Sequence, residues 1–398
     1  MPARLIVHIG QQKSGTTYLQ GILARSGPQL ESAGISYPLP WAERGAEFEN
    51  QQLAIYGFLA DASGPAMSDR VRQARRREWA ELIEAVHAAD GTVLLSAEVL
   101  AGLNRPSVKR FVAEFACPRT EIVITSRRLD QILASLWQQH VRNGRVRGLE
   151  GFLGRIADER RLPPDRLEND PEARIWREVG LAGLVRRWAG VVGLDAVRLV
   201  TNPGAPPELL WSRFSAAIGA SGVEPAPEAA LAEPSNTSLT AAEATVLAAI
   251  NAELARSELD SDARAGLRQR IIQDGFLARL DRGRPIRLGP PYDGLVASWS
   301  GQDMAELAEL AGTGLEIMGS LEDLRVTPGS GAVAPLSSSE IIAAASSATN
   351  AAIGYREPLG SRLRRSLRRA TSRGRRPAAG LTPPAEPGVE PGPDRAGR

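Results

Sequence analysis

Lys13 is one of only two lysines in a chain with 48 lysines and arginines in total; the other is Lys109. Lysine is a compact, rotatable point charge, whereas arginine is a planar fork. A lysine kept in an arginine-rich chain therefore indicates a task that arginine does not perform. Lys13 lies between Gly10 and Gly15, where a short apolar run ends and a helical pattern begins. A strand, a turn rich in Gly, Ser and Thr, and a helix start are the parts of a phosphate-binding loop.

The loop resembles the nucleotide motif G-x-x-x-x-G-K-[ST] but places its lysine differently. Gly10, Gly15 and Thr17 match the motif, while Thr16 occupies the lysine position and Lys13 lies inside the loop. An ATP or GTP hydrolase would also need an acidic Mg²⁺ ligand after a strand, and no predicted strand ends in that way. The loop is therefore predicted to bind an anion without hydrolysing a nucleotide; a helix N-cap with an unrelated lysine is the alternative.

A second set of polar residues follows the apolar run 121–125. Arg127 and Arg128 come directly after this run, and Ser135 follows on the next predicted helix. Ligands bind at the carboxyl ends of strands in open α/β sheets, and a guanidinium group with a hydroxyl suits a phosphate. Either arginine could be the phosphate ligand. A solvated arginine pair is the alternative.

Glu98 follows the predicted strand 92–96 at the same edge of the sheet. A carboxylate in this place can act as the general base that removes a proton from a hydroxyl group. A capping role at the start of a helix explains the same residue equally well.

The elements that must position these residues alternate between strand and helix. Predicted strands cover residues 5–9, 92–96, 121–125 and 197–200, and predicted helices cover 16–25, 69–89, 107–115, 129–142, 173–189, 209–218, 241–254 and 263–280. Strands separated by helices favour a parallel sheet with right-handed crossovers. The chain is predicted to be an α/β protein with three layers, in which helices flank a central parallel sheet, and residues 1–325 are expected to form one domain.

Composition and charge narrow the class of protein. A single cysteine excludes an internal disulfide framework. The first residues show no secretory pattern, and no apolar run approaches the length of about 18 residues that spans a bilayer, so a cytoplasmic location is expected. Of the net charge of +2, residues 356–398 contribute +7 and residues 1–355 contribute −5. The predicted domain is therefore not expected to bind nucleic acid, and the sequence does not specify an oligomeric state.

Residues 326–398 are predicted to be a low-complexity linker followed by a disordered, basic, Pro-rich tail. Leu359, Leu363 and Leu367 recur every four residues among arginines. This segment could make weak contact with a membrane surface or with an acidic partner. A solvated extension is the alternative.

Taken together, these residues resemble the PAPS-dependent sulfotransferase superfamily, in its bacterial and actinobacterial branch, which shares a P-loop fold with nucleotide kinases. The run HIGQQKSGTTYLQ is similar to the 5′-phosphosulfate loop of that family. The spacing of Arg127 and Ser135 matches its 3′-phosphate site, and LLSAEVL resembles the strand that carries its catalytic glutamate. The proline usual two positions after the motif arginine is Leu129 here. The resemblance covers about residues 1–325.

This resemblance implies a sulfotransferase that moves the sulfuryl group from PAPS to a hydroxyl of a carbohydrate, glycolipid or small natural product, leaving PAP. Glu98 would serve as the base, Lys13 would neutralise charge on the departing PAP, and no metal would be required. The cofactor-binding residues that it implies are Gln12, Lys13, Ser14, Gly15, Thr16, Thr17, Arg127 and Ser135. A P-loop small-molecule kinase and a non-catalytic protein that retains the nucleotide pocket are the alternatives.

The acceptor pocket is expected between the helices of residues 140–300 and the segment 38–70. Trp41, Trp137 and Trp188 could stack on a sugar there, and packing in the core is the alternative for each.

Overall fold

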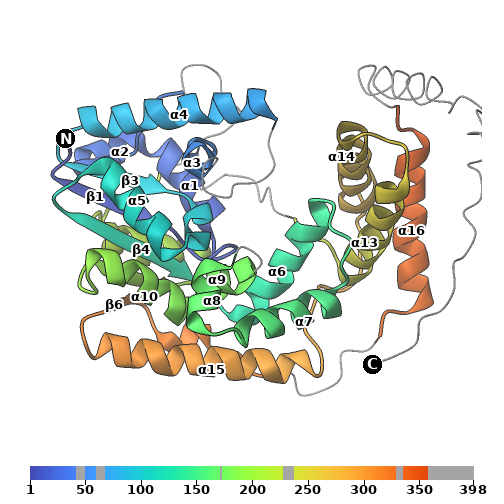
Figure 1. Cartoon of the computed structure of the whole chain (residues 1–398). Coiled ribbons are helices and arrows are strands. Elements are labelled where there is room, and N and C mark those ends of the chain that lie inside the picture. The colour runs from blue at the N-terminus through green and yellow to red at the C-terminus, as the bar shows by residue number, and fades with distance from the viewer. Residues whose placement is uncertain (42–49, 60–67, 171–172, 227–236, 329–334, 357–398) are drawn as a thin grey trace, which may run out of the picture.

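A parallel six-stranded sheet forms the centre of the computed structural model, which describes residues 1–41, 50–59, 68–170, 173–226, 237–328 and 335–356 (Figure 1). The strand order is β2-β3-β1-β4-β5-β6, and each neighbouring pair is parallel. The strands are β1 (Arg4–His8), β2 (Ile35–Ser36), β3 (Thr92–Ser96), β4 (Thr120–Ser126), β5 (Val197–Thr201) and β6 (Glu316–Met318). The α/β class and the parallel sheet are therefore as predicted from the sequence; the short edge strands β2 and β6 were not.

Helices cover both faces of this sheet and make the predicted three layers. Alternate residues of a strand point to opposite faces, so Leu5 and Val7 of β1 enter one apolar cluster and Ile6 enters another. One face is covered by α3 (Gln52–Leu59), α4 (Asp69–Ala88), α5 (Arg105–Phe115) and α10 (Leu181–Val192), and the other by α1 (Thr16–Arg25), α2 (Gly27–Ser32) and α11 (Pro207–Ile218).

A third apolar cluster holds a group of helices beyond the sheet. Figure 1 shows α13, α14 and α16 set apart from the sheet, with α6 between them and the strands. The members of this group and its neighbours are α6 (Leu129–Arg142), α7 (Leu149–Arg160), α8 (Pro164–Asn169), α9 (Arg174–Val179), α13 (Ala241–Arg256), α14 (Ser261–Arg270), η4 (Ile271–Leu277), α15 (Tyr292–Ala311) and α16 (Ser338–Ile353). Helix α6 thus joins the sheet to this group.

Two predicted helices differ from the observed ones. The helix predicted over residues 173–189 is divided into α9 and α10 at Gly180, which adopts an extended conformation with φ −73° and ψ 99°. The helix predicted over 263–280 begins as α14 and continues as the π-helical turn η4. The division at Gly180 matters for the site, because Glu178 of the separate helix α9 accepts a hydrogen bond from Gln12 in the loop after β1.

The low-complexity linker and disordered tail predicted for residues 326–398 did not include the helix α16. A capping box formed by Ser337 and Glu340 starts this helix, and its alanines, Ala344 and Ala348 among them, are buried against η4 and α13. Alanine is a strong helix former and its small side chain permits close packing, so a composition typical of disorder here folds as a helix. The basic leucine-containing segment of residues 359–367 lies outside the described residues.

Among the described residues, no helix combines the length and the apolar character that a membrane span requires.

Candidate active site

The loop between β1 and α1 has the backbone of an anion-binding loop. Gly10, Lys13 and Gly15 all have positive φ angles, of 44°, 67° and 105°. A Cβ at position 10 would lie 2.5 Å from Thr16 Cγ2, and one at position 15 would lie 2.6 Å from Leu210 Cδ2. Glycine is therefore required at both places. Lys13 holds a left-handed conformation that costs a non-glycine residue energy, and such strain is typical of functional sites.

Side chains within and below the loop hold this conformation. The Ser14 hydroxyl donates to Gln11 O at 2.7 Å and lies 2.8 Å from Thr125 Oγ1. Asn202 Nδ2 donates to Ser14 O at 2.8 Å. Ser14, expected to bind the cofactor, thus uses its side chain to shape the loop and does not line the cavity described next.

A cavity of about 220 Å³ lies between the loop and α6, and it brings together most of the residues singled out in the sequence. Its walls include seven of them: Lys13, Gly15, Thr16, Thr17, Glu98, Arg127 and Ser135. The sequence prediction missed five further residues of the wall, which are Tyr18, Gln138, Gln139, Arg142 and Ser238. We call it the anion pocket. Gln12 is not part of its wall.

The two arginines of the anion pocket, Arg127 and Arg142, each have an N–H group without a hydrogen-bond partner among the described residues. Arg127 Nη2 donates to Ser135 Oγ at 2.8 Å, and Arg142 Nη2 donates to Thr237 O at 3.1 Å. The Nε atom of each arginine is buried and has no hydrogen-bond partner within the described part of the chain. Burying an unsatisfied donor is costly, so a hydrogen-bond acceptor at either Nε atom would be favourable. Arg128 turns away and pairs with Asp130 at 2.7 Å.

Burial is the main influence on the pKa values of these cations. Burial lowers the pKa of Arg127, which the charge of Asp130 opposes, and burial lowers the pKa of Arg142, which Arg282 lowers further and Glu243 opposes. Burial also lowers the pKa of Lys13; Glu98 opposes this effect, while the charges of Arg142 and Arg127 lower that pKa further. Lys13 thus lies beside two arginines and one carboxylate, a surplus of positive charge that suits an anion.

We expect Arg142→Gln to weaken binding of an adenosine bisphosphate such as PAP by about tenfold or more, because a charged hydrogen bond contributes about 1.5–3 kcal/mol. Calorimetric titration measures this change. Arg256→Gln, an exposed arginine of α13 that pairs with Glu253, is the matched control and should bind as the parent protein does. Unchanged affinity in Arg142→Gln would contradict a ligand role for this residue.

Lys13 is also expected to titrate below the ordinary lysine pKa of 10.5. Its cationic form is then lost at a lower pH than for a solvated lysine, and a bound phosphate should raise the pKa again. Because the chain has two lysines, carbon-13 labelling of lysine Cε gives two resonances, and Lys109→Arg assigns them. A Lys13 resonance that titrates at or above 10.5 without anion would refute the electrostatic argument.

Glu98 begins the 3₁₀ helix η2 (Glu98–Gly102) directly after β3. Its Oε2 atom accepts a hydrogen bond from the hydroxyl of Thr16, the first residue of α1. The carboxylate is thereby attached to the start of α1, directly after the loop that follows β1. No side chain caps η2, so the capping role considered for Glu98 is not what fixes this helix.

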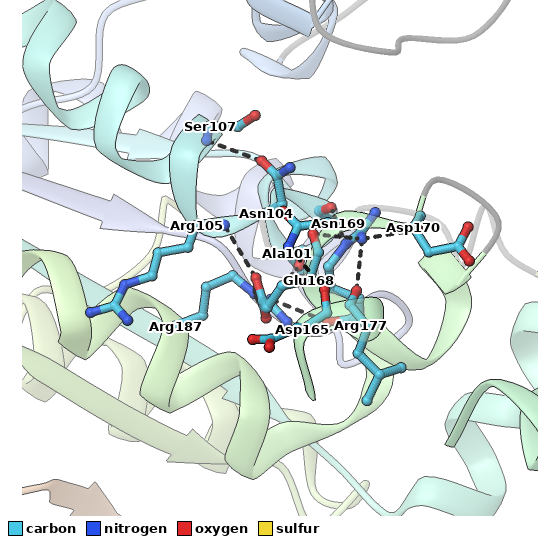
Figure 2. A network of polar contacts seen from close by, with 12 residues as sticks. Ala101, Asn104, Arg105, Ser107, Asp165, Glu168, Asn169, Asp170, Arg177 and Arg187 are labelled. Carbon is cyan, nitrogen blue, oxygen red and sulfur yellow. Dashed lines mark hydrogen bonds and ion pairs between the residues drawn. The ribbon is translucent and has the colours of Figure 1, made fainter. Parts of the chain in front are cut away.

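Two buried arginines hold the far end of η2 (Figure 2). Arg187 Nη1 donates to Ala101 O at 3.2 Å, and Arg177 Nε donates to Gly102 O at 3.0 Å. Arg187 Nε in turn donates to Glu168 Oε1 at 2.8 Å. The network fixes the carbonyl groups of η2 against α9 and α10, with Glu168 of α8 holding Arg187, and so it restricts the position of Glu98.

A larger cavity of about 870 Å³ adjoins the anion pocket. Lys13, Glu98 and Gln139 line both, and Lys13 Nζ donates to Gln139 Oε1 at 3.0 Å. Gln12 lines only the larger cavity, where its amide donates to Glu178 Oε2 at 2.8 Å. Lys13 and Glu98 therefore lie where the two cavities meet, which is where a group transferred from one ligand to another would pass.

The tryptophans proposed for sugar stacking are mostly core residues. Trp41 and Trp188 are buried in the apolar cluster on one face of the sheet. Trp137 lines the larger cavity but is 3% exposed, and its indole N–H donates to Arg147 O at 2.9 Å. Packing explains the first two, and Trp137 shapes the cavity wall.

Comparison with known proteins adds one distant likeness. No family model matches the chain, and no curated protein matches it. The crystal structure of a sulfotransferase from Alicyclobacillus acidocaldarius is 15% identical, with a TM-score of 0.42, and the match covers 78% of this chain and 95% of that chain. A likeness of this degree assigns no activity.

Proposed function

We propose that this protein is a PAPS-dependent sulfotransferase that acts on a hydroxyl group of a carbohydrate, glycolipid or small natural product. The observation that carries the proposal is the position of Lys13 and Glu98, which lie together between a cationic pocket and a larger cavity. The pocket suits a phosphorylated donor and the larger cavity suits an acceptor. A cavity of about 870 Å³ is within the range that binds small molecules.

The residues of the anion pocket fit the charges of PAPS. Arg127 and Ser135 would hold its 3′-phosphate, since Arg127 Nε is buried without a partner. Lys13 and the start of α1 would hold the 5′ end, because no side chain caps this helix and its first N–H groups can donate to an anion. PAPS supplies an activated sulfuryl group when it is bound.

The chain's own residues would then carry out two tasks. Glu98 would accept the proton of the acceptor hydroxyl as general base. Lys13 would place its ammonium group beside the oxygen on which negative charge develops, a contact worth more in the transition state than in the ground state. Gln139 supports this task because it orients the Lys13 side chain.

Thermal unfolding with PAP and with AMP tests the proposal. At a hundredfold excess over its Kd, PAP should add about 2.7 kcal/mol to the free energy of unfolding. AMP, which lacks the 3′-phosphate, should stabilise less because Arg127 stays unpaired. A melting curve that PAP leaves unchanged would overturn the proposal. Turnover of ATP with Mg²⁺ would favour the kinase alternative, and PAP binding without transfer from labelled PAPS to any hydroxyl in cell extracts would favour the non-catalytic one.

A further inference from the structure

We infer that the acceptor carries an anionic group, a carboxylate, sulfate or phosphate, in addition to its reacting hydroxyl, and that Arg145 and Arg147 bind it. The inference rests on the proposed function and deepens it by assigning the charge of the acceptor. The evidence for the inference is the excess of positive charge among the residues that line the larger cavity.

The charges that line the larger cavity do not balance. Arg174 pairs with Glu178, and Lys13 is partly neutralised by Glu98. Arg145 and Arg147 line the same cavity. Neither forms an ion pair within the part of the chain that the structure describes, whereas the fifth cation, Arg155, pairs with Glu159 at 3.0 Å.

The backbone that carries Arg145 and Arg147 is anchored on both sides. Arg145 N donates to His140 O at 2.9 Å, and Asn251 Nδ2 donates to Arg145 O at 3.0 Å. Trp137 Nε1 donates to Arg147 O at 2.9 Å. Asn251 and Trp137 are both buried. Both arginine side chains are exposed, and the fixed backbone below them reduces the entropy that binding would otherwise cost.

His140 lies in the wall of the larger cavity, where the charges of neighbouring arginines act on its imidazole. Its pKa is lowered to about 4, mainly by burial and further by the charges of Arg145, Arg155 and Arg174. The imidazole is therefore neutral near pH 7 and adds no charge of its own. Its ring packs edge-on against Phe152, with 5.2 Å between the centroids, which keeps it in the wall.

The donor does not account for these two arginines. Neither Arg145 nor Arg147 lines the anion pocket, where Arg127, Arg142 and Lys13 already offer charges to PAPS. The positive charge of the larger cavity is thus left for the second substrate. Two cations without counter-charge should bind an anionic acceptor more tightly than a neutral one, because its charge complements theirs.

Calorimetric binding to the PAP-loaded protein tests the inference with four matched probes: methyl β-D-glucoside, methyl β-D-glucuronide, glucose 6-sulfate and glucose 6-phosphate. We expect the anionic probes to bind about ten to a hundred times more tightly than the glucoside, with an affinity that falls as salt is added. The anion that binds most tightly identifies the group. Arg145→Gln/Arg147→Gln should remove the preference and keep PAP binding.

The control is Arg161→Gln/Arg325→Gln, which changes two exposed arginines outside both cavities, each in a local ion pair. It should retain the preference for anions. Equal affinity for all four probes, no binding of the anionic probes at millimolar concentration, or a preference that survives in Arg145→Gln/Arg147→Gln overturns the inference. A protein that fails to bind PAP overturns the proposed function and this inference with it.

Discussion

Lys13→Ala is expected to lower the rate of sulfuryl transfer by about a thousandfold, the loss that follows removal of one group aimed at developing charge in a transition state. PAP affinity should fall as well, by about tenfold or more, because Lys13 is one of the three cations of the anion pocket. Single-turnover transfer from labelled PAPS measures the first effect, and calorimetry measures the second.

The second lysine of the chain is a natural control for this experiment. Lys109 is exposed on α5, away from both cavities, so Lys109→Ala should leave transfer and PAP affinity unchanged. Lys13→Arg should recover PAP affinity in part but little of the rate, because a planar fork cannot replace a compact ammonium group hydrogen-bonded to Gln139. Transfer at the parental rate in Lys13→Ala would exclude the catalytic role.

The sequence predicted most accurately the places in the fold of the residues at the carboxyl ends of strands. Helices α1 and α6 and strand β3 have the predicted boundaries, and Lys13, Glu98 and Arg127 follow β1, β3 and β4. These three strands are neighbours in the sheet. Parallel strands end at one edge, so correct strand assignment was enough to bring the three residues together.

The helical periodicity of α6 also indicates which other residues share the face of Ser135. Ser135, Gln139 and Arg142 are four and three residues apart and therefore share one face of α6, the face that lines the anion pocket. Once Ser135 was proposed as a ligand, the same spacing pointed to Arg142.

The larger cavity could not be predicted in the same way. Its wall depends on α9, which exists as a separate helix only because the chain breaks at Gly180. It also depends on the anchoring of Arg145 by Asn251, more than a hundred residues away in the sequence. Contacts of this kind follow from tertiary packing, and local patterns do not encode them. The contact of the Ser14 hydroxyl with Thr125 Oγ1, which holds the loop against β4, is a similar case.

Glu98→Gln should separate catalysis from donor binding. The amide oxygen of glutamine can still accept the hydrogen bond from Thr16 that attaches Glu98 to the loop, so the loop and PAP affinity should be retained. The amide cannot take up a proton, and loss of a general base lowers rates by about 10²–10⁴-fold. Single-turnover transfer and PAP titration, measured on the same preparation, give both quantities.

Two further variants, Glu114→Gln and Glu98→Asp, test whether the effect of Glu98→Gln comes from loss of the carboxylate at this position. Glu114→Gln changes an exposed glutamate of α5 outside both cavities and should leave the rate unchanged. Glu98→Asp keeps a base but moves it back by one methylene, and it should retain more activity than Glu98→Gln because the arginines bound to Ala101 and Gly102 still fix η2. If Glu98→Gln transfers at the parental rate, another group removes the proton and Glu98 serves only to hold the loop. If it loses PAP binding together with transfer, the carboxylate charge is needed to balance Lys13, Arg127 and Arg142.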